Sequence, residues 1–288
     1  MPQLRPVLFI AFLLAGLTCV SGCIERKNKV ELKSEEYDLN KPLTLILNDA
    51  LAEISGIYFY PKDTSVFAIS DDETYLFKIH INSNTTRKWR FGDNLDYEDI
   101  TFYDSTFYVL ESNGIIHSLA FSADGDTIYT TQSELTGQED LEFESLYYEE
   151  QIQQLVLICK DCDDDKKAFT TAWGYDPVAK KYDRSLFTID VNEIAKRAGH
   201  KKIKFKPSAA TINPQTGDVW IVSAINQLIA VTDRQGKVKK VYTLDPRIFT
   251  QPEGIAFTPW GDLIIADEAG DNYGKGNLLI FKKKNYQK

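Results

Sequence analysis

Acidic residues recur at two positions of a unit that is repeated five times along the chain, and carboxylates that converge on one point bind hard divalent cations. The first position, at the start of an apolar strand, holds Ser55, Glu98, Glu144, Ser208 and Glu253. The second position, at the end of the next strand, holds Asp71, Glu111, Lys160, Ser223 and Asp267. Two residues before the first position stand Glu53, Asp96 and Glu142. The pattern predicts a ring of carboxylates.

Calcium is the cation that such a ring favours, because calcium takes about six to eight oxygen ligands in flexible geometry, whereas magnesium requires a smaller octahedral site. Clustered carboxylates repel one another unless a cation or protonation relieves the repulsion. Lys160 is the one basic residue in the set and can neutralise part of the ring. The alternative is that these acids cap strand starts and face solvent. Their recurrence at equivalent positions favours the metal site.

Short strands grouped into five units must position this ring. The starting positions are separated by 43, 46, 64 and 45 residues, and this spacing is typical of one four-stranded propeller blade per unit. The clearest internal match aligns residues 55–61 and 67–71 with residues 253–259 and 263–267. In a propeller, both recurring positions lie at the same mouth of the central channel.

The chain is therefore predicted to be all-β, with a single five-bladed β-propeller over residues 43–288. The longest interval contains an acidic insertion at residues 161–165 and a predicted helix around residues 191–198. The fifth unit lacks an outer strand after residues 277–283. A strand predicted at residues 43–47 should pair there, which would join the two ends of the chain and leave no open edge.

The N-terminal residues are typical of a bacterial lipoprotein signal, because Arg5 and an apolar run are followed by small residues directly before Cys23. The apolar run, residues 7–17, is too short to span a bilayer. We expect a signal peptide over residues 1–22, lipid on Cys23 and a polar, flexible tether over residues 23–42. The alternative is an uncleaved anchor helix. The protein is thus expected to be exported and lipid-anchored to the cell envelope.

The amino-acid composition limits which partners and which site chemistry are expected. The chain has 33 basic and 42 acidic residues, a net charge of −9 and no basic stripe, so nucleic acid is not an expected partner. A monomer is expected. Once Cys19 leaves with the signal peptide, Cys159 and Cys162 form a lone CxxC, which lacks the further ligands of a structural zinc site. A disulfide or unreactive thiols are favoured over a redox or metal role in an exported protein.

With these motifs in view, the chain resembles the SdiA-regulated (YjiK-like) lipoprotein family. The resemblance is carried by residues 53–57, 96–100, 109–111 and 252–257, and it covers about residues 43 to 283. It implies a five-bladed propeller with bound calcium, distantly similar to propellers of NHL repeats and of paraoxonase-like and phytase-like hydrolases. The implied calcium ligands are Glu98, Glu144 and Glu253, with Asp71, Asp267 and Glu53 as weaker candidates. Ser208 and Ser223 depart from the pattern and leave the fourth blade without acids.

Two functions remain open: a calcium-stabilised binding module for a small-molecule or protein ligand on the acidic face, and a calcium-dependent hydrolase of phosphoesters or lactones. The sequence has no GxSxG or HExxH motif and only His80, His117 and His200. A metal-activated water with a glutamate base needs none of these, so hydrolysis is not excluded. A phytase-like site would require several basic residues, and only Lys160 is placed to help. The binding role is favoured.

Overall fold

Each repeat folds as an antiparallel sheet of four strands, because short runs of β-branched and aromatic residues alternate with turn residues. The computed structural model describes residues 36–93, 96–135, 141–162, 168–270 and 274–284, all within one compact unit of residues 32–288. The predicted signal peptide and Cys23 lie outside the described residues. Within the described part of the chain, no helix is long and apolar enough to cross a membrane.

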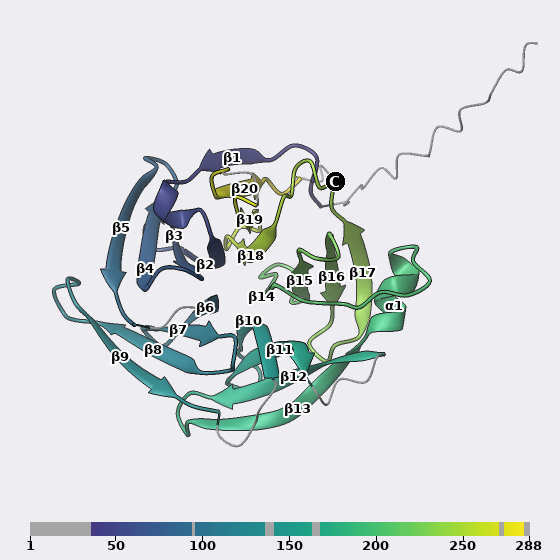
Figure 1. Cartoon of the computed structure of the whole chain (residues 1–288), viewed down its shortest axis with the longest axis horizontal. Helices are drawn as coiled ribbons and strands as arrows, with labels where there is room; N and C mark the ends of the chain where they lie inside the picture. Colours follow the sequence, from purple (N-terminus) through teal and green to yellow (C-terminus); the bar gives the residue numbers. More distant parts are fainter. Residues whose placement is uncertain (1–35, 94–95, 136–140, 163–167, 271–273, 285–288) are drawn as a thin grey trace, which may run out of the picture. The chain divides into compact units, whose positions relative to one another are not determined.

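Five sheets follow one another along the chain (Figure 1). The first contains β2 (Ile54–Tyr60), β3 (Ser65–Ser70), β4 (Tyr75–His80) and β5 (Thr85–Arg90). The second contains β6 (Tyr97–Tyr103), β7 (Thr106–Glu111), β8 (Ile116–Phe121) and β9 (Ile128–Ser133). The third contains β10 (Leu141–Glu149), β11 (Gln154–Cys162), β12 (Phe169–Asp176) and β13 (Lys181–Asp190). The fourth contains β14 (Ala209–Ile212), β15 (Val219–Ser223), β16 (Leu228–Thr232) and β17 (Val238–Thr243). The fifth contains β18 (Pro252–Phe257), β19 (Leu263–Asp267), β20 (Asn277–Phe281) and β1 (Leu43–Ile46).

The innermost strands form a closed ring, as Figure 1 shows. Each of β2, β6, β10 and β14 contacts the innermost strand of the next sheet, and β18 contacts β2. The predicted all-β, five-bladed propeller is therefore confirmed. Because the inner strands run side by side in the same direction, their first residues meet at one mouth of the channel and their last residues meet at the other.

The fifth sheet contains both ends of the described chain. Strand β1 pairs antiparallel with β20, with Leu43 opposite Ile280 and Ile46 opposite Asn277. The folded part begins before β1, since Tyr37 and Leu39 are buried in the hydrophobic cluster between the fourth and fifth sheets. The expected tether of residues 23–42 is thus too long at its C-terminal end, because these two apolar side chains belong to the core.

The hydrophobic core fills the spaces between neighbouring sheets, with one cluster for each of the five interfaces. Every residue of β3 and of β15 is buried. The interval between the third and fourth sheets contains α1 (Val191–Arg197), whose first turn is capped by the Asp190 carboxylate, and this confirms the helix predicted there. A short 3₁₀ helix, η1 (Asp49–Leu51), precedes β2.

Candidate functional site

A cavity of about 410 Å³ lies at the mouth of the channel where the inner strands begin. Seven carboxylates and one ammonium line it, together with Ser55, Ser112 and Gln251. The charged side chains are Asp71, Asp96, Glu98, Glu142, Glu144, Glu253, Glu268 and Lys160. The structure therefore brings together acids that are far apart in the sequence, contributed by the first, second, third and fifth sheets. We call this set of residues the acidic cavity.

β-bulges aim the key glutamates into the acidic cavity. In the second sheet, Tyr97 pairs with Glu111 and Asp99 with Leu110, so Glu98 is an extra residue without an opposite partner. Glu144 and Glu253 are the extra residues at the equivalent points of the third and fifth sheets. A bulge bends the strand and re-aims the extra side chain. The recurring first position thus marks a repeated backbone irregularity as well as a recurring acid.

The acidic cavity carries more negative charge than its surroundings compensate. Burial and the neighbouring Asp96 carboxylate raise the pKa of Glu98 to about 8. Burial, together with the carboxylates of Asp72 and Glu53, raises the pKa of Asp71 to about 6. Burial also raises the pKa of Glu253, against a hydrogen bond with Ser208 that lowers it. Such shifts mean that the folded protein favours the protonated form of these groups more than the unfolded chain does, unless a cation is bound.

Lys160 supplies part of the compensation. Its Nζ lies 2.8 Å from Glu142 Oε1 and also forms an ion pair with Glu144. A disulfide joins Cys159 to Cys162, on either side of Lys160 in the sequence, and fixes the end of β11 from which this side chain projects. The next residue, Asp161, pairs instead with Lys204. The lone CxxC is thus a structural disulfide beside the acidic cavity.

Asp267 and Glu111, which the sequence predicted at the acidic mouth, do not line the acidic cavity and bind other groups instead. Asp267 is buried and accepts hydrogen bonds from the backbone N–H groups of Thr250 and Gln251, at 3.1 and 2.9 Å, so it fixes the segment before β18. Glu111 is buried and accepts a hydrogen bond of 2.6 Å from Nε2 of His117. Both carboxylates therefore support the strands behind the acidic cavity instead of lining it.

Glu53 and Ser208 lie next to the acidic cavity. Glu53 lines a neighbouring cavity, which it shares with Glu268. Burial and a hydrogen bond with Glu53 raise the pKa of Glu268 to about 9. Ser208 is a hydrogen-bond partner of the Glu253 carboxyl group. Glu268 thus connects the two cavities, and this residue was missed in the sequence because it stands one place after the second recurring position.

Asp99 is buried among the inner strands next to Glu98. Its side chain is buried and accepts hydrogen bonds from the backbone N–H groups of Ile100 at 2.8 Å, Leu146 at 2.7 Å and Ala210 at 3.5 Å. One carboxyl group thereby joins the inner strands of the second, third and fourth sheets. Burial raises the pKa of Asp99 well above its usual range. A Cβ added at Gly56 would lie 2.4 Å from the Asp99 Cα, so this centre has no spare room.

The donors of the acidic cavity match a hard cation in chemistry and charge, since its titratable acids offer only oxygen atoms. As the side chains stand, no group of three or more His, Cys, Asp or Glu residues among those described is arranged to hold a metal ion. Glu144 is engaged with Lys160, whereas Glu98 is surrounded by Asp96, Glu253 and Asp71. A cation would therefore require the carboxylates around Glu98 to converge by side-chain rotation.

A family model identifies the family of the chain, and solved structures are similar to it in fold. The family model described as SdiA-regulated matches residues 29–273. No curated protein matches the chain in sequence. A glutaminyl cyclase from Myxococcus xanthus is similar in structure, with a TM-score of 0.55 and 15% identity, over 85% of this chain and 100% of that chain. Regucalcin from Agrobacterium tumefaciens, a calcium-binding protein, gives a TM-score of 0.50 and 13% identity, over 86% of this chain and 95% of that chain. At these identities the likeness concerns the fold alone.

Proposed function

Because the chain belongs to the SdiA-regulated family, we propose that it is a lipid-anchored protein of the cell envelope whose propeller binds calcium in the acidic cavity and presents this face to a ligand. The lipid would be carried by Cys23, after removal of residues 1–22. Labelling with radioactive palmitate should mark the wild-type protein and leave Cys23→Ala unlabelled. Label on both proteins, or on neither, would contradict the anchor.

One observation carries the calcium proposal: Glu98 is buried in the acidic cavity, and this burial, together with the carboxylates of Asp96, Glu253 and Asp71, raises its pKa to about 8. A bound dication would relieve this repulsion, and calcium tolerates an irregular set of oxygen ligands better than magnesium does. Glu98, Glu253 and Asp71 are the residues that would hold it. Glu144 would join them if Lys160 moved aside. A calcium-binding protein is among the structural neighbours, which is consistent with the proposal without identifying the ligands.

Thermal unfolding with calcium and with a chelator tests the proposal. At a calcium concentration about 100 times the Kd, binding to the folded state adds about 2.7 kcal/mol of stability, which corresponds to a rise in Tm of about 5–10 °C for a propeller of this size. Glu98→Gln should lose most of this rise, because it removes a charged ligand and keeps the shape of the side chain. Glu150→Gln is the matched control, since Glu150 lies at the opposite mouth of the channel. An equal rise in all three proteins would contradict a site at Glu98.

Lys160→Met should destabilise the calcium-free protein and strengthen its binding of calcium. Without calcium the Tm should fall, because Glu142 and Glu144 lose their counter-ion. With calcium the affinity should rise about tenfold, because two carboxylates become available and a competing positive charge is removed. Lys206→Met is the control, since Lys206 pairs with Asp161 away from the acidic cavity. Weaker calcium binding by Lys160→Met would show that Lys160 does not compete with the cation.

Hydrolysis is the second candidate, and two features favour it. The acidic cavity has room for a small substrate, and it holds carboxylates besides Glu98, Glu253 and Asp71, so a base remains beside a bound cation. Panels of phosphoesters and lactones should be tested with calcium and with chelator, in wild type and Glu98→Gln. Turnover that is lost in Glu98→Gln would favour the enzyme. Stabilisation by calcium without turnover of any panel member would favour the binding role.

A further inference from the structure

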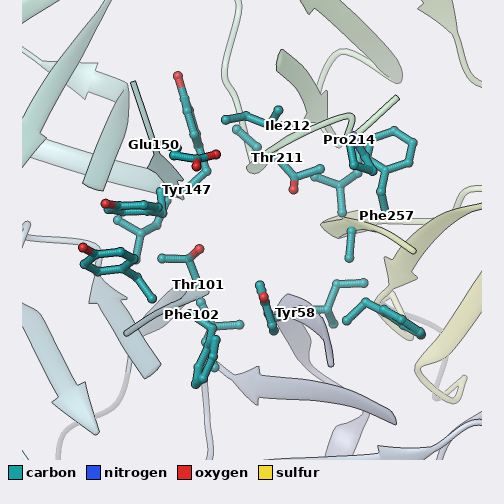
Figure 2. A pocket seen from close by; sticks show the side chains of 18 of the residues that line it. Tyr58, Thr101, Phe102, Tyr147, Glu150, Thr211, Ile212, Pro214 and Phe257 are labelled. Carbon is teal, nitrogen blue, oxygen red and sulfur yellow. The ribbon is translucent and has the colours of Figure 1, made fainter. Parts of the chain in front are cut away.

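A second cavity, of about 610 Å³, lies at the opposite mouth of the channel, where the inner strands end. Figure 2 shows Tyr58, Phe102 and Phe257 from three sheets around it, together with Thr101 and Thr211. Three prolines, Pro61, Pro214 and Pro259, also line it. Two of its lining side chains are charged, Glu150 and Arg234, and Arg234 forms an ion pair with the buried Glu149. We call this set of residues the aromatic cavity.

The turns around the aromatic cavity expose large apolar side chains. Trp260 is 52% exposed and directly follows Pro259, while Ile152 is 49% exposed and stands two residues after Glu150. Val178 is 86% exposed in the turn between β12 and β13. This turn lies at the same mouth, because Tyr175 pairs with Leu155 near the start of β11. Trp260 and Ile152 thus stand in turns whose residues Pro259 and Glu150 line the aromatic cavity, whereas Val178 stands farther out on the third sheet.

The described chain begins at this same mouth. The Tyr37 hydroxyl donates a hydrogen bond of 2.6 Å to the carbonyl of Gly261, the residue after Trp260. Lys284 N–H donates to the Glu36 carbonyl at 2.9 Å, so residues 36 and 284 lie together. Residues 24–35, twelve in number, separate Cys23 from Glu36. Even fully extended, twelve residues span at most about 43 Å, so lipid on Cys23 would keep the propeller within that distance of the membrane, with the chain leaving the propeller at the mouth that holds the aromatic cavity.

The two mouths of the channel differ in charge. The acidic cavity carries seven carboxylates, and about one inner-strand length, roughly 20 Å, separates its mouth from the mouth of the aromatic cavity. Bacterial membranes present anionic lipids, which repel clustered carboxylates and tolerate an aromatic surface. Tryptophan in particular favours the interface between lipid and water. The mouth with the aromatic cavity therefore suits the membrane better than the acidic mouth does, and the acidic mouth suits the aqueous side.

We propose that the aromatic cavity faces the membrane and binds the acyl chain of a membrane lipid, with Trp260 in the interface. This inference rests on the lipid anchor that is part of the proposed function. The inference goes beyond the proposed function because it assigns a ligand class to the aromatic cavity and an orientation to the propeller. The acidic cavity then points away from the bilayer, where calcium and a soluble ligand reach it freely.

Tryptophan quenching in vesicles tests the orientation. The full lipoprotein, purified from bacterial membranes, is reconstituted into phosphatidylcholine vesicles whose acyl chains carry bromine, and Trp260→Phe is measured in parallel to isolate the Trp260 signal. Quenching of Trp260 by at least about half is expected. The matched reporter is Ile225→Trp in the Trp260→Phe background. Ile225 is 65% exposed in the turn between β15 and β16, at the acidic mouth, and a tryptophan there should not be quenched.

Native mass spectrometry tests the occupant of the aromatic cavity. Protein released in mild detergent should retain one phospholipid, and Ile212→Glu, which places a charge in the wall shown in Figure 2, should lose it. Ile225→Glu makes the same change at the acidic mouth and should retain the lipid. Circular dichroism confirms that both variants are folded. Retention by Ile212→Glu, or a second copy of the chain in place of lipid, would overturn the proposal.

Separate measurements distinguish a failure of the proposed lipid anchor from a failure of the proposed orientation. Flotation of the protein with vesicles reports the anchor alone. A protein that floats without quenching of Trp260 has its anchor but not the proposed orientation, and the inference is then wrong while the proposed function stands. A protein that does not float lacks the anchor, and both are then overturned. Calcium binding in the acidic cavity is tested independently of either outcome.

Discussion

Asp99→Ala should lower the free energy of unfolding by about 3–5 kcal/mol, because it leaves three buried backbone N–H groups without their acceptor and each unsatisfied group costs about 1–3 kcal/mol. Ile100, Leu146 and Ala210 belong to three different sheets, so the change loosens the centre of the ring. The Tm should fall by about 10 °C or more. Urea unfolding followed by circular dichroism measures the difference.

Asp93→Ala is the control for this change. Asp93 is exposed and forms a surface ion pair with Arg90, and such pairs contribute at most about 1 kcal/mol. The two variants remove the same carboxyl group from contrasting surroundings. If Asp99→Ala unfolds at the same urea concentration as Asp93→Ala, the Asp99 side chain does not join the inner strands as described.

In calcium-free protein, the free energy of unfolding should fall by about 2–4 kcal/mol as the pH rises from 5 to 8. The pKa of Glu98 is raised to about 8 in the folded state, so the folded protein holds a proton that the unfolded chain has already released. Its contribution to stability is present below the unfolded pKa, near 4.5, and is lost as the pH rises towards 8. Asp71, with a pKa of about 6, acts in the same direction over a narrower range.

Two comparisons check the origin of this pH dependence. Residue 98 cannot titrate in Glu98→Gln, so the fall in its free energy of unfolding over the same range should be smaller than that of wild type, while Asp71 and Glu268 keep the remainder of the fall. Added calcium should also flatten the profile, because a cation favours the ionised carboxylates. Urea unfolding at pH 5, 6, 7 and 8 after removal of calcium gives the required profile. Stability that rises with pH in this window would show that the carboxylates are compensated by groups other than a cation.

The repeat spacing was enough to predict the blades, because each unit must supply four strands with similar turns. It also placed Glu98, Glu144 and Glu253 at one mouth of the channel. Their orientation depends on β-bulges, which have no sequence signature in a single chain. Asp99 is an example of a residue whose role the sequence did not predict. It stands beside Glu98 in the same motif, yet the bulge directs Glu98 into the acidic cavity and leaves Asp99 at the buried centre.

Other parts of the site could not be predicted, because they depend on contacts between residues that a sequence pattern does not reveal. Asp267 and Glu111 occupy recurring positions, but the local backbone and His117 supply partners that keep them behind the acidic cavity. Glu268 lines it without occupying either position. The polar composition of residues 23–42 suggested a tether, and the two apolar side chains of Tyr37 and Leu39 were too few to reveal a core segment. The aromatic cavity is built from strand ends whose convergence only the folded ring shows.

Calorimetric titration of calcium into the protein at pH 7.5 tests the central claim most directly. Wild type and Glu150→Gln should each bind one calcium ion per chain in the acidic cavity with similar affinity. Glu98→Gln should bind at least about tenfold more weakly, a difference of about 1.4 kcal/mol. If wild type binds no calcium, or if Glu98→Gln binds it as tightly as wild type does, the acidic cavity is not a calcium site.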